Sequence, residues 1–202
     1  MSERVDFFYS FRSPYSYLAA PRAFELADRH DIDLVFRGVT PMAMRGQSVP
    51  MSKRLHTLRD VKREADRLGM PFGRVHDPIG DGARRCLVVS EHAVDAGRGR
   101  EFVLEAGRAI WSDAADVATD RGLRPVCESA GLSWEDCAAA LEDPAMQARV
   151  DKNIAALLAL GHWGVPVLIV RGEPFWGQDR IEDAEAALGM GAAGFEPAIS
   201  RV

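Results

Sequence analysis

Residues 6–18 read D-F-F-Y-S-F-R-S-P-Y-S-Y-L, the pattern of a strand that runs directly into a helix. Residues 5–9 are aromatic and β-branched, as in a buried strand. Ser13 then favours a helix N-cap, with Pro14 at the first helical position, where no N–H is needed. Backbone N–H groups and the positive end of the helix dipole therefore meet beside Ser13, where an anion such as a thiolate is stabilised. A lone Ser-Pro more often marks only an ordinary helix cap.

The next segments continue this start as a β-α-β unit. Residues 14–30 predict a helix, and residues 32–37 alternate loosely between apolar and polar side chains, which predicts a second strand. Parallel strands with a right-handed crossover are by far the commonest arrangement for such a unit. Pro21 has no N–H, so it predicts either a bend in this helix or an early end to it.

The middle of the chain, residues 41–161, shows helical patterns and no strand. The predicted helices span residues 52–68, 81–96, 101–111, 115–121 and 124–130, and two more begin at Ser133 and at Asp143. Because strand patterns lie on both sides of this block, we interpret it as an insertion rather than as a tandem domain.

Strand patterns return after Gly161. Residues 165–170 and 174–176 predict a tight β-hairpin that turns at residues 171–173. A last helix follows and reaches Leu188, and residues 189–202 are rich in glycine and alanine, which predicts a loosely held tail.

Charge and hydropathy exclude several kinds of partner. The 202 residues carry a formal net charge of −5, which argues against nucleic acid and anionic membranes. No apolar run approaches the roughly 18 residues that span a bilayer, and residues 1–4 do not begin a signal peptide. We therefore expect a cytoplasmic protein that takes small molecules as partners.

The cysteines give no sign of a redox or metal site. Cys86, Cys127 and Cys137 have no C-x-x-C spacing, and together with five scattered histidines they show no zinc-ligand pattern. We expect them to be buried thiols that pack as small apolar residues. No pair of histidine and aspartate suggests a serine hydrolase either.

The motif S-P-Y-S-Y-L that begins at Ser13, after an aromatic strand, resembles the start of the 2-hydroxychromene-2-carboxylate isomerases. These enzymes are relatives of the kappa-class glutathione transferases in the DsbA-like branch of the thioredoxin fold. The resemblance implies an α/β chain with a discontinuous thioredoxin-like domain, residues 1–40 and 162–202, and an all-helical insertion domain, residues 41–161. Serine at both dithiol positions, Ser13 and Ser16, cannot cycle a disulfide.

Two later motifs extend the resemblance and imply a glutathione site. Gly164-Val165-Pro166 resembles the cis-proline element of the thioredoxin fold, in which Val165 would pair with the cysteinyl backbone of glutathione. Gly177-Gln178-Asp179-Arg180 resembles the element that holds the γ-glutamyl end, where a carboxylate pairs with the ammonium group.

Ordinary structural interpretations of these residues stay open. Pro166 also fits a residue that only opens an edge strand, and Asp179 fits a helix-capping aspartate at least as well. Lys53 matches the family position that reaches toward the tripeptide, but a lysine on a charged helix is usually only solvated.

The family implies a glutathione-dependent isomerase, a homodimer, that acts on an aromatic chromene or α-keto carboxylate. The glutathione thiolate would add reversibly to the conjugated substrate, permit bond rotation and leave again. Ser13 would donate a hydrogen bond to the sulfur and would not itself be the nucleophile. The substrate carboxylate would meet Arg84 or Arg85, and Arg12 would add a further carboxylate-binding group, although each of these arginines also fits a solvated position.

Three residues depart from the family pattern, and two other functions stay open. The isomerases usually carry an aspartate at the position of Ser10, an apolar residue at Arg12, and Asn or Ser at Gln178. The alternatives are a kappa-like glutathione transferase or peroxidase, and a non-catalytic thiol- or peptide-binding protein on a thioredoxin scaffold.

Overall fold

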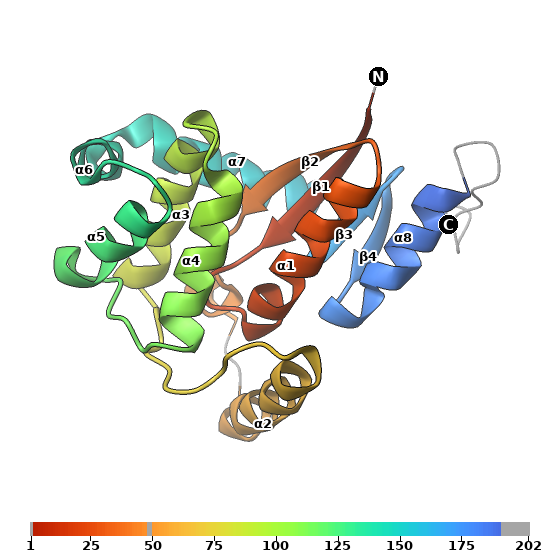
Figure 1. Cartoon of the computed structure of the whole chain (residues 1–202), viewed down its shortest axis with the longest axis horizontal. Coiled ribbons are helices and arrows are strands. Elements are labelled where there is room, and N and C mark those ends of the chain that lie inside the picture. Colours follow the sequence, from red (N-terminus) through yellow and green to blue (C-terminus); the bar gives the residue numbers. More distant parts are fainter. Residues whose placement is uncertain (1, 48–49, 191–202) are drawn as a thin grey trace.

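A four-stranded mixed sheet lies at the centre of the computed structural model, which describes residues 2–47 and 50–190 (Figure 1). The strands are β1 (Glu3–Tyr9), β2 (Ile32–Gly38), β3 (Val167–Val170) and β4 (Glu173–Trp176), in the order β2-β1-β3-β4. β1 is parallel to β2 and antiparallel to β3, and β3 is antiparallel to β4. The predicted β-α-β start and the late hairpin are therefore confirmed, and the fold is the thioredoxin fold with a helical insertion.

Helices cover both faces of the sheet and extend past its β2 edge (Figure 1). They are α1 (Pro14–Arg29), η1 (Met42–Arg45), α2 (Met51–Leu68), α3 (Asp81–Asp95), α4 (Gly99–Trp111), α5 (Asp120–Ser129), α6 (Trp134–Glu142), α7 (Pro144–Ala159), η2 (Gln178–Arg180) and α8 (Ile181–Gly189). β1 and β2 lie within residues 3–38, and β3 and β4 lie within residues 167–176. The helices α2 to α7 lie between these two segments in the chain. The domain bounds 40/41 and 161/162 themselves stay a prediction.

The sheet is apolar on both sides because helices pack on both sides. Val5 and Phe7 of β1 belong to the larger core with α1 and α8, whereas Phe8 packs with Leu157 of α7 and Val167 of β3. This double burial explains why the first strand reads as a run of aromatic residues rather than as a strict alternation.

Phe24 of α1 joins the sheet to the insertion. Its ring is 2% exposed and meets Phe7 and Phe36 edge to face, with ring centroids 6.5 Å and 5.2 Å away. The guanidinium of Arg100, from α4, lies 5.4 Å from the centre of the same ring. One side chain therefore contacts both strands of the β-α-β unit and the insertion.

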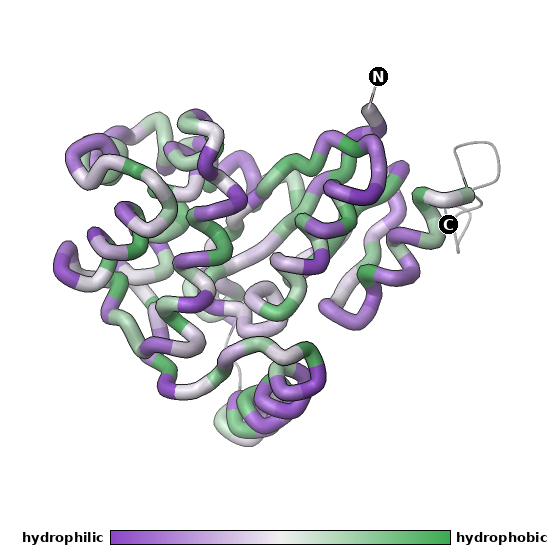
Figure 2. Tube along the Cα trace, viewed as in Figure 1, coloured by the Kyte–Doolittle hydropathy of each residue, from purple (hydrophilic) through white to green (hydrophobic). Residues whose placement is uncertain are grey.

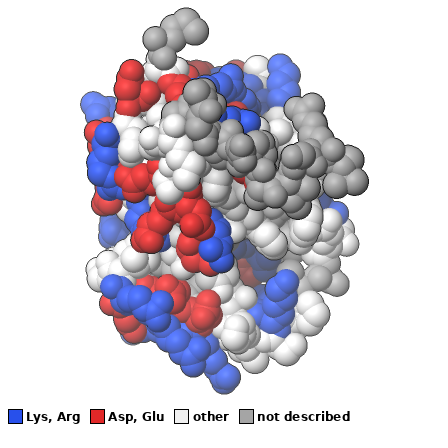
Figure 3. Space-filling model, turned by 90° about the vertical axis from the view of Figure 1, so that its right-hand side faces the viewer, with Lys and Arg blue, Asp and Glu red and all other residues white. Residues whose placement is uncertain are grey.

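The exposed faces of the helices are rich in charged and polar side chains. Figure 2 shows long hydrophilic stretches along α2, where only Val61 and Ala65 are buried. Figure 3 shows acidic and basic side chains next to one another on the face that carries α8, in keeping with ion pairs such as Arg29–Glu185 at 2.9 Å. In residues 2–47 and 50–190, no helix combines the length and the apolar character needed to cross a membrane.

α1 continues through Pro21 to Arg29, so the alternative of an early end at this proline is wrong. All three cysteines are buried free thiols, as predicted. The predicted tail begins at Gly189, the last residue of α8, and most of it, residues 191–202, lies outside the described residues.

The predicted helix at residues 115–121 is wrong. This segment is a turn that leads into one helix, α5, where two short helices were expected. Thr119 caps α5 by accepting a hydrogen bond from the amide of Gly122 over 3.2 Å. A Cβ atom on Gly122 would lie 2.0 Å from the carbonyl oxygen of Asp116, so the turn folds back tightly onto the helix. The third strand was also predicted two residues early, since β3 begins at Val167.

Candidate active site

The turn between β1 and α1 is closed by serine hydrogen bonds. Ser13 Oγ accepts from the amide of Ser16 over 3.2 Å, and Ser13 N–H donates to the carbonyl of Ser10 over 2.9 Å. Ser16 Oγ in turn accepts from the amide of Ser10 over 3.2 Å. Ser13 is therefore the predicted N-cap. Pro14 has no N–H, and the amide of Tyr15 is too early in α1 to reach a helical carbonyl, so it remains a donor at the positive end of the helix dipole.

The cis-proline segment lies against this N-cap. The Val165–Pro166 bond is cis, as the resemblance implied. Ser13 Oγ donates to the carbonyl oxygen of Val165 over 3.4 Å, although the two residues are 152 positions apart in the chain. The implied isomer is therefore confirmed, and the structure in addition places the segment beside Ser13.

The predicted γ-glutamyl element is tied to the cis-proline segment. Gly177 donates its N–H to the carbonyl of Pro166 over 3.0 Å. Its φ of +122° suits glycine, and a Cβ atom there would lie 2.3 Å from Oδ1 of Asp179. The structure therefore brings Ser13, from the start of the chain, near Val165 and Asp179, which lie 14 positions apart close to its other end.

Gln178 and Asp179 have different surroundings. Gln178 is buried, and its carbonyl oxygen and Oε1 accept from Arg22 Nη1 over 2.6 Å and 3.1 Å, while its Nε2 donates to Glu64 over 3.4 Å. The side chain of Asp179 is 62% exposed and pairs with Arg180 at 3.5 Å. Gln178 therefore braces η2 against α1 and α2, and Asp179 is the member that faces outward.

Tyr15 lies among carboxylates that sequence reasoning missed. Its hydroxyl donates to Asp60 Oδ2 over 2.6 Å, which joins α1 to α2. Burial raises the pKa of Tyr15, and the hydrogen bond to Asp60 together with the charges of Asp60, Glu64 and Asp179 raises it further. Three carboxylates thus lie around the Tyr15 hydroxyl; Glu64 is paired with Arg67 and Asp179 with Arg180, whereas Asp60 is bound by the phenol itself.

Arg12 does not point freely into solvent, so that alternative is wrong. Its side chain is 16% exposed and binds both oxygens of Asp77, from Nε over 2.7 Å and from Nη2 over 2.8 Å. Arg54 of α2 donates to the same carboxylate over 3.4 Å. Burial of Asp77 opposes ionisation, but the bonds and charge of Arg12 outweigh it and hold the pKa of Asp77 below its ordinary value.

The remaining predicted residues are not brought to Ser13 by any contact in the described part of the chain. Lys53 is exposed on the first turn of α2. Arg84 pairs with Asp81 on its own helix at 3.5 Å, and Arg85 pairs with Asp120 at the start of α5. Their roles in binding stay predictions.

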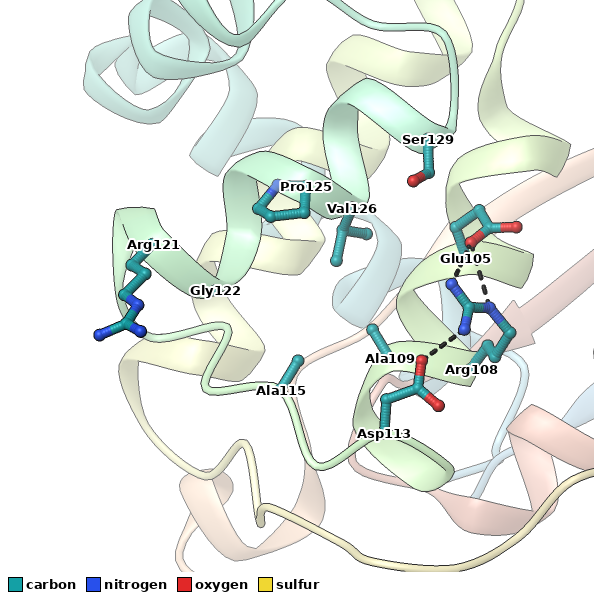
Figure 4. Close-up of a pocket in the computed structure, with 10 residues that line it drawn as sticks. All are labelled: Glu105, Arg108, Ala109, Asp113, Ala115, Arg121, Gly122, Pro125, Val126 and Ser129. Carbon is teal, nitrogen blue, oxygen red and sulfur yellow. Dashed lines mark hydrogen bonds and ion pairs between the residues drawn. The ribbon is translucent and has the colours of Figure 1, made fainter.

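A separate cavity of about 210 Å³ lies between α4 and α5 (Figure 4). Arg108 projects toward Glu105 and Asp113 there and pairs with both, so its charge is already compensated. None of the predicted site residues lines this cavity. The candidate site is therefore the junction of the α1 N-terminus, the cis-proline segment and η2.

Known proteins resemble this chain over nearly its whole length. Residues 4–189 match the family described as DSBA-like thioredoxin domain. The chain is 26% identical to a 2-hydroxychromene-2-carboxylate isomerase from Pseudomonas putida, with 92% of this chain and 94% of that protein covered. It is also 26% identical to a protein of the same name from Sphingobium xenophagum, with 93% and 99% covered. A solved structure of a 2-hydroxychromene-2-carboxylate isomerase superposes with a TM-score of 0.78 at 24% identity and covers 92% of this chain and 94% of its own.

Proposed function

This chain belongs to the family of DSBA-like thioredoxin domains, and from that membership we propose that it is a glutathione-dependent isomerase of the 2-hydroxychromene-2-carboxylate type. Its named relatives at 26% identity support an isomerase that acts on a small aromatic molecule. The observation that carries the proposal is the 3.4 Å contact between Ser13 Oγ and the Val165 carbonyl oxygen, because it joins the anion-stabilising helix end to the backbone that would hold a thiol ligand.

The residues at the site fit the three parts of glutathione. The Ser13 hydroxyl and the Tyr15 amide are donors suited to a thiolate. Val165 is partly exposed and offers its backbone to a peptide bond. The exposed carboxylate of Asp179 suits an α-ammonium group.

Glutathione, when bound, supplies the thiolate that adds to the conjugated substrate. The chain's own part is to hold that sulfur ionised. Helix N-termini lower thiol pKa values from about 8.5 toward neutral. Ser13 Oγ is well placed to help, because its bond to Val165 is long and its hydroxyl can rotate toward a stronger, anionic acceptor. Ser13 then acts as a donor while its Oγ keeps the N-cap bond from Ser16.

The first test is the dependence of activity on glutathione. We expect the purified protein to interconvert the chromene carboxylate and its open-chain keto acid only when glutathione is added, because the described site holds no cysteine of its own. Absorbance of the conjugated open form measures the reaction. Conjugation of a model electrophile without isomerisation would favour the transferase, and failure to bind glutathione would favour the non-catalytic thiol-binding protein.

A second test concerns Asp179. We expect Asp179→Ala to weaken glutathione binding by about two- to fivefold, the modest effect of losing a partly solvated ion pair. KM for glutathione should rise more than kcat falls, since the contact is the same throughout the reaction. Asp183→Ala is the matched control, because Asp183 is also exposed and pairs with the same Arg180 at 3.0 Å. Equal affinities of the two variants in calorimetry would refute the assignment.

A further inference from the structure

Two arginines, Arg12 and Arg54, share the carboxylate of Asp77. Arg12 immediately precedes the N-cap residue Ser13. Asp77 accepts two hydrogen bonds from Arg12 and a third from Arg54, and its Oδ1 also accepts the amide of Ile79 over 3.2 Å. Two positive charges thus meet one negative charge, so one positive charge is left over. The cluster is fixed to the loop between α2 and α3, which carries Asp77.

Arg54 is the member of this cluster with donors to spare. A guanidinium has five N–H groups. Arg54 gives one nitrogen to Asp77, and its side chain is 46% exposed. Arg12 uses Nε and Nη2, which leaves its Nη1 unclaimed among the hydrogen bonds of the described residues. Arg54 therefore keeps exposed N–H groups of the kind that pair with a planar carboxylate, and Arg12 keeps Nη1.

An aromatic ring on the same loop is held beside this part of the chain. Phe72 is partly buried and stacks on Trp111, with centroids 6.1 Å apart and ring planes inclined by 12°. Trp111 donates from Nε1 to the carbonyl of Phe11 over 3.2 Å, next to Arg12. The Phe72 ring is thus connected through Trp111 to Phe11, the residue before Arg12.

We propose that Arg54, together with the free side of Arg12, binds the carboxylate of the aromatic substrate, and that Asp77 is the positioning residue that holds both arginines. This inference rests on the proposed isomerase function and names the group that recognises its substrate. Arg12 directly precedes the N-cap residue Ser13, so the proposed carboxylate site and the proposed thiolate site belong to the same turn between β1 and α1.

Salicylate, an aromatic carboxylate that does not isomerise, tests the inference by calorimetry on the full chain loaded with glutathione. We expect Arg54→Met to weaken salicylate binding by about tenfold and Arg54→Lys by less, since lysine keeps the charge but not the fork. Arg59→Met, an exposed arginine of the same helix outside the cluster, should change nothing. In turnover, Arg54→Met should raise KM for the carboxylate substrate with little change in kcat.

The outcomes separate this inference from the proposed function. Glutathione affinity of the wild type, measured alone, tests the function. Equal salicylate affinity in Arg54→Met and Arg59→Met, or no binding of millimolar salicylate by the wild type, would overturn the role of Arg54 whether or not glutathione binds. Binding of salicylamide as tight as that of salicylate would overturn it too, because the amide carries no charge.

Discussion

Ser13→Ala is expected to slow isomerisation by about one to two decades and to raise the pKa of enzyme-bound glutathione. The Ser13 hydroxyl is one of two donors, with the Tyr15 amide, that the helix start offers to a bound sulfur. A hydrogen bond to a charged group contributes about 1.5–3 kcal/mol, which is roughly one to two decades in rate. The fold should survive, because the amide of Ser16 also donates to the Ser13 carbonyl over 3.0 Å.

The pH dependence gives the sign of this effect. A donor to the sulfur stabilises the thiolate, so it lowers the pKa of the bound thiol, and turnover rises with pH through that lowered value. Without the hydroxyl, the rise should move to higher pH. Thiolate absorbance of the complex against pH measures both proteins directly.

A matched control separates catalysis from capping. Ser133→Ala removes another N-cap serine, which accepts from the amide of Asp136 over 3.4 Å at the start of α6. Each loss of a cap should cost about 1 kcal/mol of stability. If Ser13→Ala titrates and turns over like wild type and like Ser133→Ala, Ser13 is only a helix cap.

Phe24→Ala is expected to lower the free energy of unfolding by about 3–5 kcal/mol, the usual cost of emptying an aromatic site in a core. The ring is 2% exposed, and removing it takes away its contacts with Phe7, Phe36 and Arg100 together. The cavity would lie between α1, the sheet and α4, where three elements cannot all collapse inward. Urea unfolding measures the change.

Leu158→Ala is the control for this prediction. Leu158 is 53% exposed on α7, so its truncation should stay within about 0.5 kcal/mol. Similar losses in the two variants would contradict the central place of Phe24 in the core.

Local patterns were enough to predict most of the fold. The aromatic strand, the Ser-Pro helix start and the hairpin each depend on a few neighbouring residues, and the hairpin turn indeed places Arg171 and Gly172 at φ values of 51° and 85°. The turn at residues 115–119 could not be predicted this way. It depends on how closely Gly122 approaches the carbonyl of Asp116, which is a packing contact and leaves no periodic signal.

The candidate site also has residues that local patterns identify and residues that only the tertiary structure identifies. Ser13, Val165, Pro166 and Asp179 could be proposed from the sequence because each belongs to a short motif. Tyr15–Asp60 and Arg12–Asp77 are hydrogen-bonded pairs 45 and 65 positions apart. Asp60 sits on a helix with many charged residues, so nothing in the sequence distinguishes the one carboxylate that faces the phenol. Such partners follow from the tertiary structure alone.

The pairing of β1 with β3 also sets the order in which the sheet can form during synthesis of the chain. Val5 lies opposite Val170, so the first strand of the sheet meets a partner that leaves the ribosome only after the whole helical insertion has been synthesised. Non-local strand pairing of this kind slows folding, since the chain between the strands must be closed into a loop first. One edge of β1 therefore stays unpaired while the whole insertion is translated. Early compaction of the helical insertion shortens the loop between β1 and β3 and brings the two strands close enough to pair.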